Sequence, residues 1–333
     1  MTVWSKHIPQ CPTTRHRFPK QIMSKILAVF GATGQQGSSV VANVLSDPEL
    51  SKGYSLRALT RDISSTKAKD LADRGVEVVA ADMTSRESVA SALQGVHTVF
   101  IVTVPTFTPH GFEVEYNTGK LIADVSVELG VSYIIFSTLP HVSKLSGGTF
   151  KHVTHFDAKA QIEIYIRTLK VRSAFVSLGA YMQNFSGIPF FTPQKANDSD
   201  AYVIALPTSS QQKWPFLDAE ADTGKFVGAI LAEPEKFEGK VFSASEGLYC
   251  WEEIVAALSK SSGKKVVYRQ LTVEAFKEGL PFAKDAFAEA LGHIDAGYYG
   301  SETEALVKWA NENARGKLIG LGAYLQAHPL QLV

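Results

Sequence analysis

The sequence predicts an α/β fold: a doubly wound parallel sheet with a smaller α+β lobe toward the C-terminus. Two observations predict it. From residue 26 the chain runs through a short apolar segment, a turn with three glycines and a stretch of apolar residues at helical spacing. Strand-like and helix-like segments then alternate as far as residue 178, an order typical of parallel sheets with helices on both faces.

The first element is the apolar run 26–30, which has the pattern of a fully buried strand. Glycines follow at 31, 34 and 37, and a helix begins among them. Glycines let the backbone turn sharply and let a pyrophosphate approach, while the helix N-terminus offers free N–H groups and a positive dipole end. The alternative is a purely structural turn. We predict dinucleotide binding through Gly31, Thr33, Gly34, Gln35, Gln36 and Gly37.

The second strand, 54–60, ends at Arg61 and Asp62. In a doubly wound sheet this strand end meets the adenosine ribose, where a carboxylate selects NAD and an arginine pairs with the 2′-phosphate of NADP. Arg61 comes first and Lys67 lies close enough to add a second cation, whereas Asp62 leaves the NAD alternative open. A solvated charge pair at a strand end is the plainer interpretation. We favour NADP(H) over NAD(H).

Further alternation extends the sheet. We expect helices at 65–74, 85–93 and 113–129 and strands at 76–81, 97–103 and 131–138. Ligands of such sheets bind at the carboxyl ends of the strands. The predicted cofactor-binding residues therefore include Asp82 and Met83, which could reach the adenine edge, and Thr103 and Pro105 at the end of the next strand. Ser137 and Thr138 end the fifth strand.

The second half of the chain is less regular. A helix at 155–169 and a strand at 172–178 are followed by Tyr181 and Asn184, which could wall the nicotinamide pocket, although Tyr181 could equally pack in the core. Residues 186–213 look like loops or irregular strands. We expect strands at 214–218, 240–244 and 265–269 and helices at 223–231, 251–262, 272–279, 282–291 and 302–313. The chain thus divides into a nucleotide-binding domain, 24–185, and a smaller substrate or partner lobe, 186–333, with about 214–245 returning to the first sheet.

Composition narrows the class of protein. A formal net charge of +0 gives no electrostatic case for direct nucleic-acid or membrane binding. The sequence has two cysteines, Cys11 and Cys250, which are too few for a disulfide framework. We therefore expect a cytoplasmic protein, with the nucleus as an alternative location. Residues 1–23 are basic, lack Asp and Glu and contain three prolines, which argues against an amphipathic presequence. We expect a disordered arm, or a start at Met23.

Other polar and aromatic residues have plainer interpretations. His152 and His155 could bring two imidazoles to one metal, but no cysteine or carboxylate has a suitable spacing, so we expect no metal site. Phe190, Phe191, Trp214 and Phe216 could line an apolar pocket or simply pack in the core. Asp218 has the position of a helix N-cap.

Five stretches together resemble a known family: 31–37 (GATGQQG), 59–62 (LTRD), 100–103 (FIVT), 155–159 (HFDAK) and 214–218 (WPFLD). Over roughly 24–325 the chain resembles the NmrA-like proteins, a branch of the atypical short-chain dehydrogenase/reductases. The resemblance implies a Rossmann sheet with a smaller C-terminal lobe and the cofactor lying across the strand ends. Members of this family include fungal nitrogen-metabolite repressors that bind a GATA-type transcription factor, NADPH-sensing proteins and NAD(P)H-dependent reductases.

The resemblance also implies where chemistry would occur. Active short-chain dehydrogenases carry Tyr-x-x-x-Lys on one helix face, and the lysine holds the nicotinamide ribose and lowers the pKa of the tyrosine that donates the proton. Here Lys159 keeps the lysine position, but His155 replaces the tyrosine. Ser137 and Thr138 supply hydroxyls after the fifth strand, unless the family's serine falls one residue later, at Leu139. An imidazole beside an ammonium should favour its neutral form, a poorer proton donor.

Two functions follow. The first is an NADP(H)-binding, redox- or cofactor-sensing regulator that acts through a transcription factor or another regulatory protein. The second is an NADPH-dependent reductase of a small apolar carbonyl, enone or quinone, with His155, Tyr181 or a water as the acid. The replaced tyrosine leads us to favour the regulator.

Overall fold

A seven-stranded parallel sheet is the centre of the molecule. The computed structural model describes residues 24–197 and 199–332, so the predictions for residues 1–23 lie outside it. The strand order is β11-β6-β5-β4-β1-β2-β3, which confirms the predicted doubly wound fold. These strands are β1 (Lys25–Phe30), β2 (Tyr54–Thr60), β3 (Glu77–Ala80), β4 (Thr98–Ile101), β5 (Tyr133–Thr138), β6 (Arg172–Leu178) and β11 (Val241–Ala244).

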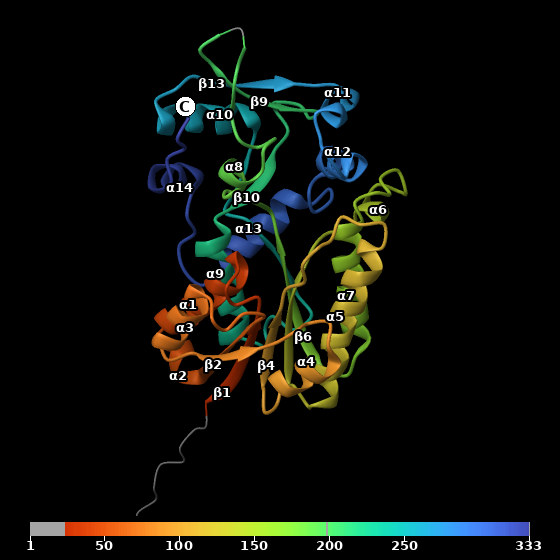
Figure 1. The fold of residues 1–333 in the computed structure, drawn as a ribbon, viewed down its shortest axis with the longest axis vertical. Helices are drawn as coiled ribbons and strands as arrows, with labels where there is room; N and C mark the ends of the chain where they lie inside the picture. The colour runs from red at the N-terminus through yellow and green to blue at the C-terminus, as the bar shows by residue number, and fades with distance from the viewer. Residues whose placement is uncertain (1–23, 198, 333) are drawn as a thin grey trace, which may run out of the picture.

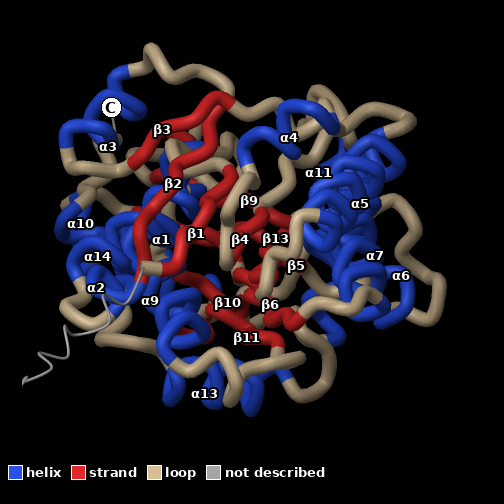
Figure 2. The backbone as a smooth tube through the Cα atoms, turned by 90° about the horizontal axis from the view of Figure 1, so that it is seen from below, coloured by secondary structure: helices blue, strands red, loops and turns tan. Residues whose placement is uncertain are grey.

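Helices cover both faces of this sheet (Figures 1 and 2). Apolar side chains of α1 and α9 form one core with the sheet, and those of α4, α5 and α7 form another on the opposite face. The helices of this part of the chain are α1 (Gln35–Ser46), α2 (Leu50–Gly53), α3 (Thr66–Asp73), α4 (Arg86–Ala92), α5 (Gly111–Glu128), α6 (Val142–Leu145), α7 (Thr154–Thr168) and α9 (Ala219–Ala232).

Helix α9 packs very closely on α1. The Gly224 N–H donates to Ser39 Oγ at 2.9 Å, and a Cβ at Gly224 would lie 2.2 Å from the Ser39 carbonyl oxygen. Only glycine permits this approach, because no side chain fits between the two backbones. A segment late in the chain thereby supports the helix that begins at the glycine turn.

The remaining chain forms two small sheets and the helices around them. One sheet has the order β12-β10-β7 and the other β13-β9-β8, and their shared core is rich in aromatic residues. The strands are β7 (Ala180–Tyr181), β8 (Gln194–Lys195), β9 (Tyr202–Leu206), β10 (Trp214–Leu217), β12 (Gly247–Tyr249) and β13 (Val266–Gln270). The helices are α8 (Asn184–Gly187), α10 (Trp251–Ser262), α11 (Val273–Glu278), α12 (Lys284–Gly292), the 3₁₀ helix η1 (His293–Ala296) and α14 (Leu321–Ala327). Helix α13 (Thr303–Asn313) returns to the large sheet and packs on β11.

The structure differs from the sequence-based expectations mainly in this second half. Residues 202–206, within the stretch expected to be loops or irregular strands, form β9 with alternating burial, and helix α14 was not expected. The helix expected to start at 223 starts at Ala219, because Asp218 Oδ1 accepts from the N–H groups of Glu220 and Ala221, which confirms the N-cap. Among the described helices none has the length and apolarity that crossing a membrane requires.

Candidate nucleotide-binding site

The glycine turn joins β1 to α1 in a tight backbone bend. Gly31 has a φ of 64°, and the Gly34 N–H donates to the Gly31 carbonyl at 2.9 Å. A Cβ at Gly37 would lie 2.2 Å from the Gly31 oxygen and 2.8 Å from Ala32 Cα. The first glycine therefore supplies the left-handed conformation, and the third lets the helix approach the turn.

The N-terminus of α1 is open at this turn. Gly34 is the N-cap and has no side chain, and the Ser38 N–H makes the bond to Gly34 O that begins the helical ladder. The N–H groups of Gln35, Gln36 and Gly37 therefore precede the intrahelical bonds. The first turn of α1 contains no acidic residue, so its positive dipole end is not neutralised locally. This arrangement suits a phosphate group.

Gln36 connects the turn to the chain beyond β6. Its Nε2 donates to the Tyr181 hydroxyl at 2.6 Å, and burial raises the pKa of Tyr181 to about 12. Gln36 Oε1 is buried and has no partner among the described residues, which leaves one acceptor for a ligand. Asn184 begins α8, beyond Met182, which is fully buried in the aromatic core.

Two exposed cations lie beside the glycine turn. Lys67 Nζ of α3 donates to the Thr33 carbonyl at 3.3 Å, and the hydrogen bonds from Thr84 and, less strongly, the charge of Arg61 lower the pKa of Asp82. The Asp62 carboxylate is engaged in its own turn: Oδ1 accepts from the N–H of Ser64 at 2.8 Å and from its hydroxyl at 2.6 Å.

Asp82 is engaged in the same way. Its Oδ1 accepts from the N–H of Thr84 at 2.9 Å and from its hydroxyl at 2.7 Å. Met83, the next residue, packs partly buried against the core on the α4–α5 face. One oxygen of each carboxylate predicted near the adenosine thus has local partners, whereas Lys67 uses one of its three donors and Arg61 has no hydrogen-bond partner among the described residues.

Lys159 lies in a buried polar cluster. Its Nζ donates to the Thr103 carbonyl at 2.8 Å, to Thr103 Oγ1 at 2.7 Å and to Glu115 Oε1 at 2.6 Å. Thr103 Oγ1 in turn donates to Glu115 Oε1 at 2.6 Å. Burial lowers the pKa of Lys159, and the Glu115 carboxylate acts in the opposite direction. An ammonium has three donors, so all three are used inside the protein.

His155 lies one turn before Lys159 on α7. Burial, and after it the charge of Lys159, lower the pKa of His155 to about 4, so the imidazole is neutral at pH 7. Its Nδ1 is buried without a partner among the described residues. The ring packs against Phe107 at 5.1 Å and Phe156 at 4.9 Å between centroids. This geometry is that of a neutral ring in an aromatic environment.

The predicted hydroxyls and Pro105 lie around the same strand ends. Ser137 and Thr138 end β5 and are almost fully buried. Thr138 Oγ1 makes two long contacts of 3.4 Å, to the carbonyls of Leu139 and Lys159. Pro105 is half-buried between β4 and α5.

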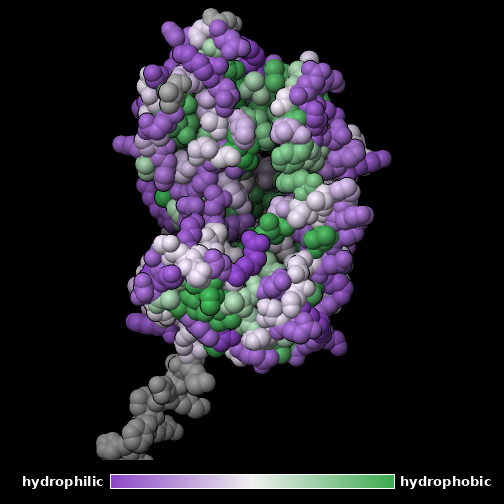
Figure 3. Space-filling view, viewed as in Figure 1, coloured by the Kyte–Doolittle hydropathy of each residue, from purple (hydrophilic) through white to green (hydrophobic). Residues whose placement is uncertain are grey.

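Two large aromatic side chains that pack together beside His155 are exposed. Figure 3 shows a hollow at mid-height with apolar residues along one rim. Phe107 and Phe282 are 43% and 55% exposed, and their rings lie 6.0 Å apart. Such exposure is unusual for large aromatic side chains and is consistent with a ligand-binding rim. In contrast, Phe191, Trp214 and Phe216 are buried in the aromatic core, which confirms packing as their role.

Two histidines close to His155 in the sequence have carboxylate partners. His152 Nδ1 lies 2.6 Å from Glu289 Oε1, and His141 Nδ1 lies 3.0 Å from Asp157 Oδ1. No hydrogen bond or ion pair joins His155 to Glu289 or Asp157, so neither carboxylate connects His152 with His155.

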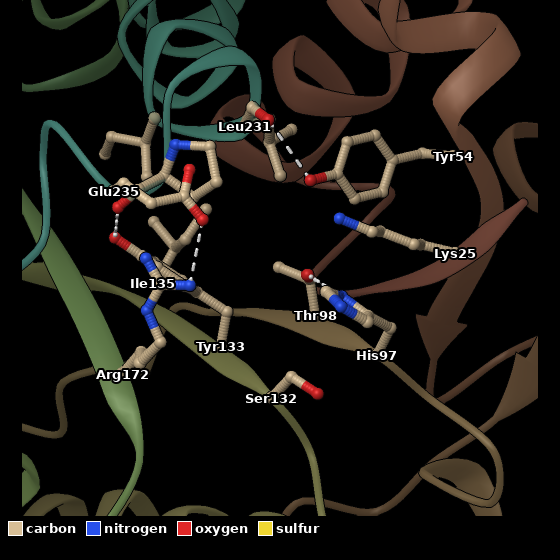
Figure 4. Close-up of a pocket in the computed structure, with 12 residues that line it drawn as sticks. Lys25, Tyr54, His97, Thr98, Ser132, Tyr133, Ile135, Arg172, Leu231 and Glu235 are labelled. Carbon is tan, nitrogen blue, oxygen red and sulfur yellow. Dashed lines mark hydrogen bonds and ion pairs between the residues drawn. The ribbon is translucent and has the colours of Figure 1, made fainter.

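A separate small cavity of about 90 Å³ lies at the amino ends of the strands, at the opposite end of the sheet from the glycine turn (Figure 4). Lys25, His97, Arg172 and Glu235 line it, and Arg172 is paired with Glu235 at 3.1 Å. No residue of the predicted nucleotide site lines this cavity.

Sequence reasoning missed Glu115. The signal in the sequence was a carboxylate at a helix position that faces inward. Glu115, Gly119 and Ile122 share this face of α5, and all three are buried. A charged residue at such a position needs a buried partner of opposite charge. Lys159 lies 44 residues away in the sequence, and no local pattern joins the two.

Comparison with known proteins gives a consistent family assignment. A model described as the NmrA-like family matches residues 23–324. An NmrA-like family domain-containing protein of Dictyostelium discoideum is 34% identical over 257 residues, covering 74% of this chain and 80% of its own. An NmrA-like family domain-containing oxidoreductase, PtmS of Penicillium ochrochloron, is 30% identical over 303 residues, covering 84% of this chain and 87% of its own.

A solved structure shares the fold. NmrA, described as a negative transcriptional regulator, is 23% identical and superposes with a TM-score of 0.77 in its NAD complex, covering 92% of this chain and 95% of that chain. Its NADP complex gives a TM-score of 0.76. That protein therefore binds both dinucleotides, and at this identity the likeness to our chain is one of fold.

Proposed function

The chain belongs to the NmrA-like family, and from this premise we propose that it binds NADP(H) and acts as a cofactor-sensing regulator. One observation carries the regulatory part of the proposal. All three N–H donors of Lys159 are used by Thr103 and Glu115, so the lysine has no donor left for the nicotinamide ribose. The usual lysine function of a short-chain dehydrogenase is thereby unavailable in this arrangement.

The state of His155 supports the same proposal. A pKa of about 4 leaves the imidazole neutral at physiological pH, and a neutral imidazole is a weak acid. The site thus has the glycine turn of a nucleotide-binding protein without an effective proton donor at the tyrosine position.

Preference for NADP(H) is supported by the charges at the adenosine end. Arg61 and Lys67 are exposed cations, whereas Oδ1 of the Asp62 carboxylate already accepts two hydrogen bonds from Ser64 in the turn after β2. A 2′-phosphate would gain charge-assisted hydrogen bonds from the two cations.

Regulation requires that the bound nucleotide change a surface. Gln36 and Tyr181 join the glycine turn to the chain that enters the C-terminal lobe, so a ligand at the turn has a direct route to that lobe. We propose a regulatory protein as the partner, a transcription factor being one case, in the cytoplasm or the nucleus.

A second function, reduction of a small apolar carbonyl, enone or quinone, is favoured by a different observation. The exposed ring of Phe107 lies next to His155 and packs against the exposed ring of Phe282, and the two rings could receive an apolar substrate. The relative from Penicillium ochrochloron is named an oxidoreductase. Hydride transfer itself needs only the cofactor held in the correct geometry.

The deciding experiment combines calorimetry and turnover. NADPH, NADP⁺, NADH and NAD⁺ are titrated into the full chain, and NADPH absorbance is then followed with a panel of quinones and enones. Tight NADP(H) binding without turnover supports the regulator. Sustained turnover that disappears in Lys159→Ala supports the reductase, and the absence of any nucleotide binding overturns both functions.

A further inference from the structure

We propose that Glu115 is a positioning residue that holds Lys159 away from the nucleotide, so that an entering nicotinamide ribose competes with this carboxylate for the ammonium. The inference rests on the proposed nucleotide binding and concerns a residue that the sequence did not single out. It explains how a site with a lysine in the usual position can bind a nucleotide without engaging that lysine.

The geometry leaves the lysine no free donor. Glu115 comes from α5 and Lys159 from α7, and their side chains are 1% and 8% exposed. The contact of 2.6 Å joins opposite charges out of water, where it is much stronger than at the surface. A ribose hydroxyl can therefore accept from Lys159 only after one of the existing bonds is given up.

Glu115 is the acceptor that a substitution can weaken selectively. The Thr103 carbonyl belongs to the backbone after β4 and cannot be altered by mutation of its side chain. Glu115 Oε1 accepts from both Lys159 and Thr103, whereas Oε2 is buried with no partner among the described residues. The carboxylate is thus attached through one oxygen, and the Lys159 ammonium is what compensates its charge.

The test uses two probes that differ at the nicotinamide end. NADPH carries the nicotinamide ribose, whereas adenosine 2′,5′-bisphosphate carries only the adenosine end expected near Arg61 and Lys67. Glu115→Gln keeps the shape of the side chain and removes its charge, which weakens its hold on Lys159. We expect NADPH to bind about fivefold more tightly to this variant, the difference between a charge-assisted and a neutral hydrogen bond. Binding of the bisphosphate should not change.

Further variants complete the experiment. Asp124→Asn removes a carboxylate of the same helix that pairs with Lys120 at 2.7 Å near the surface, and it should change neither affinity. In Lys159→Met, adding Glu115→Gln should no longer tighten NADPH binding. Should Glu115→Gln fail to fold, Glu115→Asp retains the charge, shortens the side chain that reaches Lys159 and should tighten NADPH binding in the same selective way.

The outcomes separate the two proposals. Selective tightening for NADPH that needs Lys159 supports the inference. Unchanged or weaker NADPH binding, or equal shifts for both probes, overturns it, because a merely structural role would not distinguish the nicotinamide end. Wild-type protein that binds neither probe would instead overturn the proposed nucleotide binding.

Discussion

Gln36 and Tyr181, 145 residues apart in the sequence, are joined by a hydrogen bond of 2.6 Å from the amide to the phenol. Gln36 lies in the first turn of α1 and Tyr181 lies in β7, so the bond connects the glycine turn to a strand of a second sheet. The geometry of the candidate nucleotide site therefore depends on a contact between the two halves of the chain.

Tyr181→Phe should destabilise the protein and loosen the glycine turn. The substitution leaves the Gln36 amide without its acceptor in a part-buried position, at a cost of about 1–3 kcal/mol. Urea denaturation measures this loss, and calorimetry should show weaker NADPH binding. The double variant Gln36→Leu/Tyr181→Phe should lose less stability than the two single losses added together, because both polar partners are then gone. Strictly additive losses would mean that the bond has no energetic role.

Gly37→Ala should be poorly tolerated. The new Cβ would lie 2.2 Å from the Gly31 oxygen and 2.6 Å from its carbonyl carbon, so α1 would have to move away from the turn. We expect a loss of about 3 kcal/mol in the free energy of unfolding and a large loss of nucleotide affinity. Gly53→Ala is the matched control, because its Cβ would meet no atom within 4 Å. Equal effects of the two substitutions would contradict the close-approach argument.

Much of the fold could be predicted from local pattern. Strands such as β4 and β5 are buried throughout and mostly apolar because both faces of a parallel sheet are covered, and Gly75, Gly95 and Gly130 follow helices α3, α4 and α5 with positive φ. The second half was harder, since a five-residue strand such as β9 is paired with the distant β13 and its short alternating pattern is ambiguous.

The site was predictable only where its chemistry is local. The glycine turn and its cations occur within one strand–helix–strand unit and were identified from spacing. The contacts of Lys159 with Thr103 and Glu115 span 56 and 44 residues, and the hydrogen bonds of Asp62 depend on the loop conformation. Residue spacing therefore identified Lys159 but not the carboxylate that holds it.

Removing the two exposed cations should change the choice of nucleotide. Arg61→Ala and Lys67→Ala should each weaken NADPH binding about tenfold while NADH binding stays nearly constant, because only NADPH carries the 2′-phosphate. Competitive titration of the two nucleotides measures the ratio. Lys69→Ala, an exposed lysine of the same helix, serves as the control for a general loss of positive charge. A parallel loss for NADPH and NADH would contradict a 2′-phosphate site.

His155 should make the stability of the protein depend on pH. Its pKa falls from 6.5 to about 4 on folding, chiefly through burial, so between these values the unfolded chain binds more protons than the folded one. The free energy of unfolding must therefore decrease as the pH is lowered from about 6.5 to about 4, by roughly 2 kcal/mol for this group.

His155→Asn removes the titration and should flatten that part of the profile in urea denaturation at several pH values. His293, whose pKa burial also lowers, is retained in both proteins and cancels in the difference. If His155→Asn and the wild type lost stability in parallel below pH 6.5, the imidazole would have to be charged in the folded protein, and the case against it as a proton donor would fail.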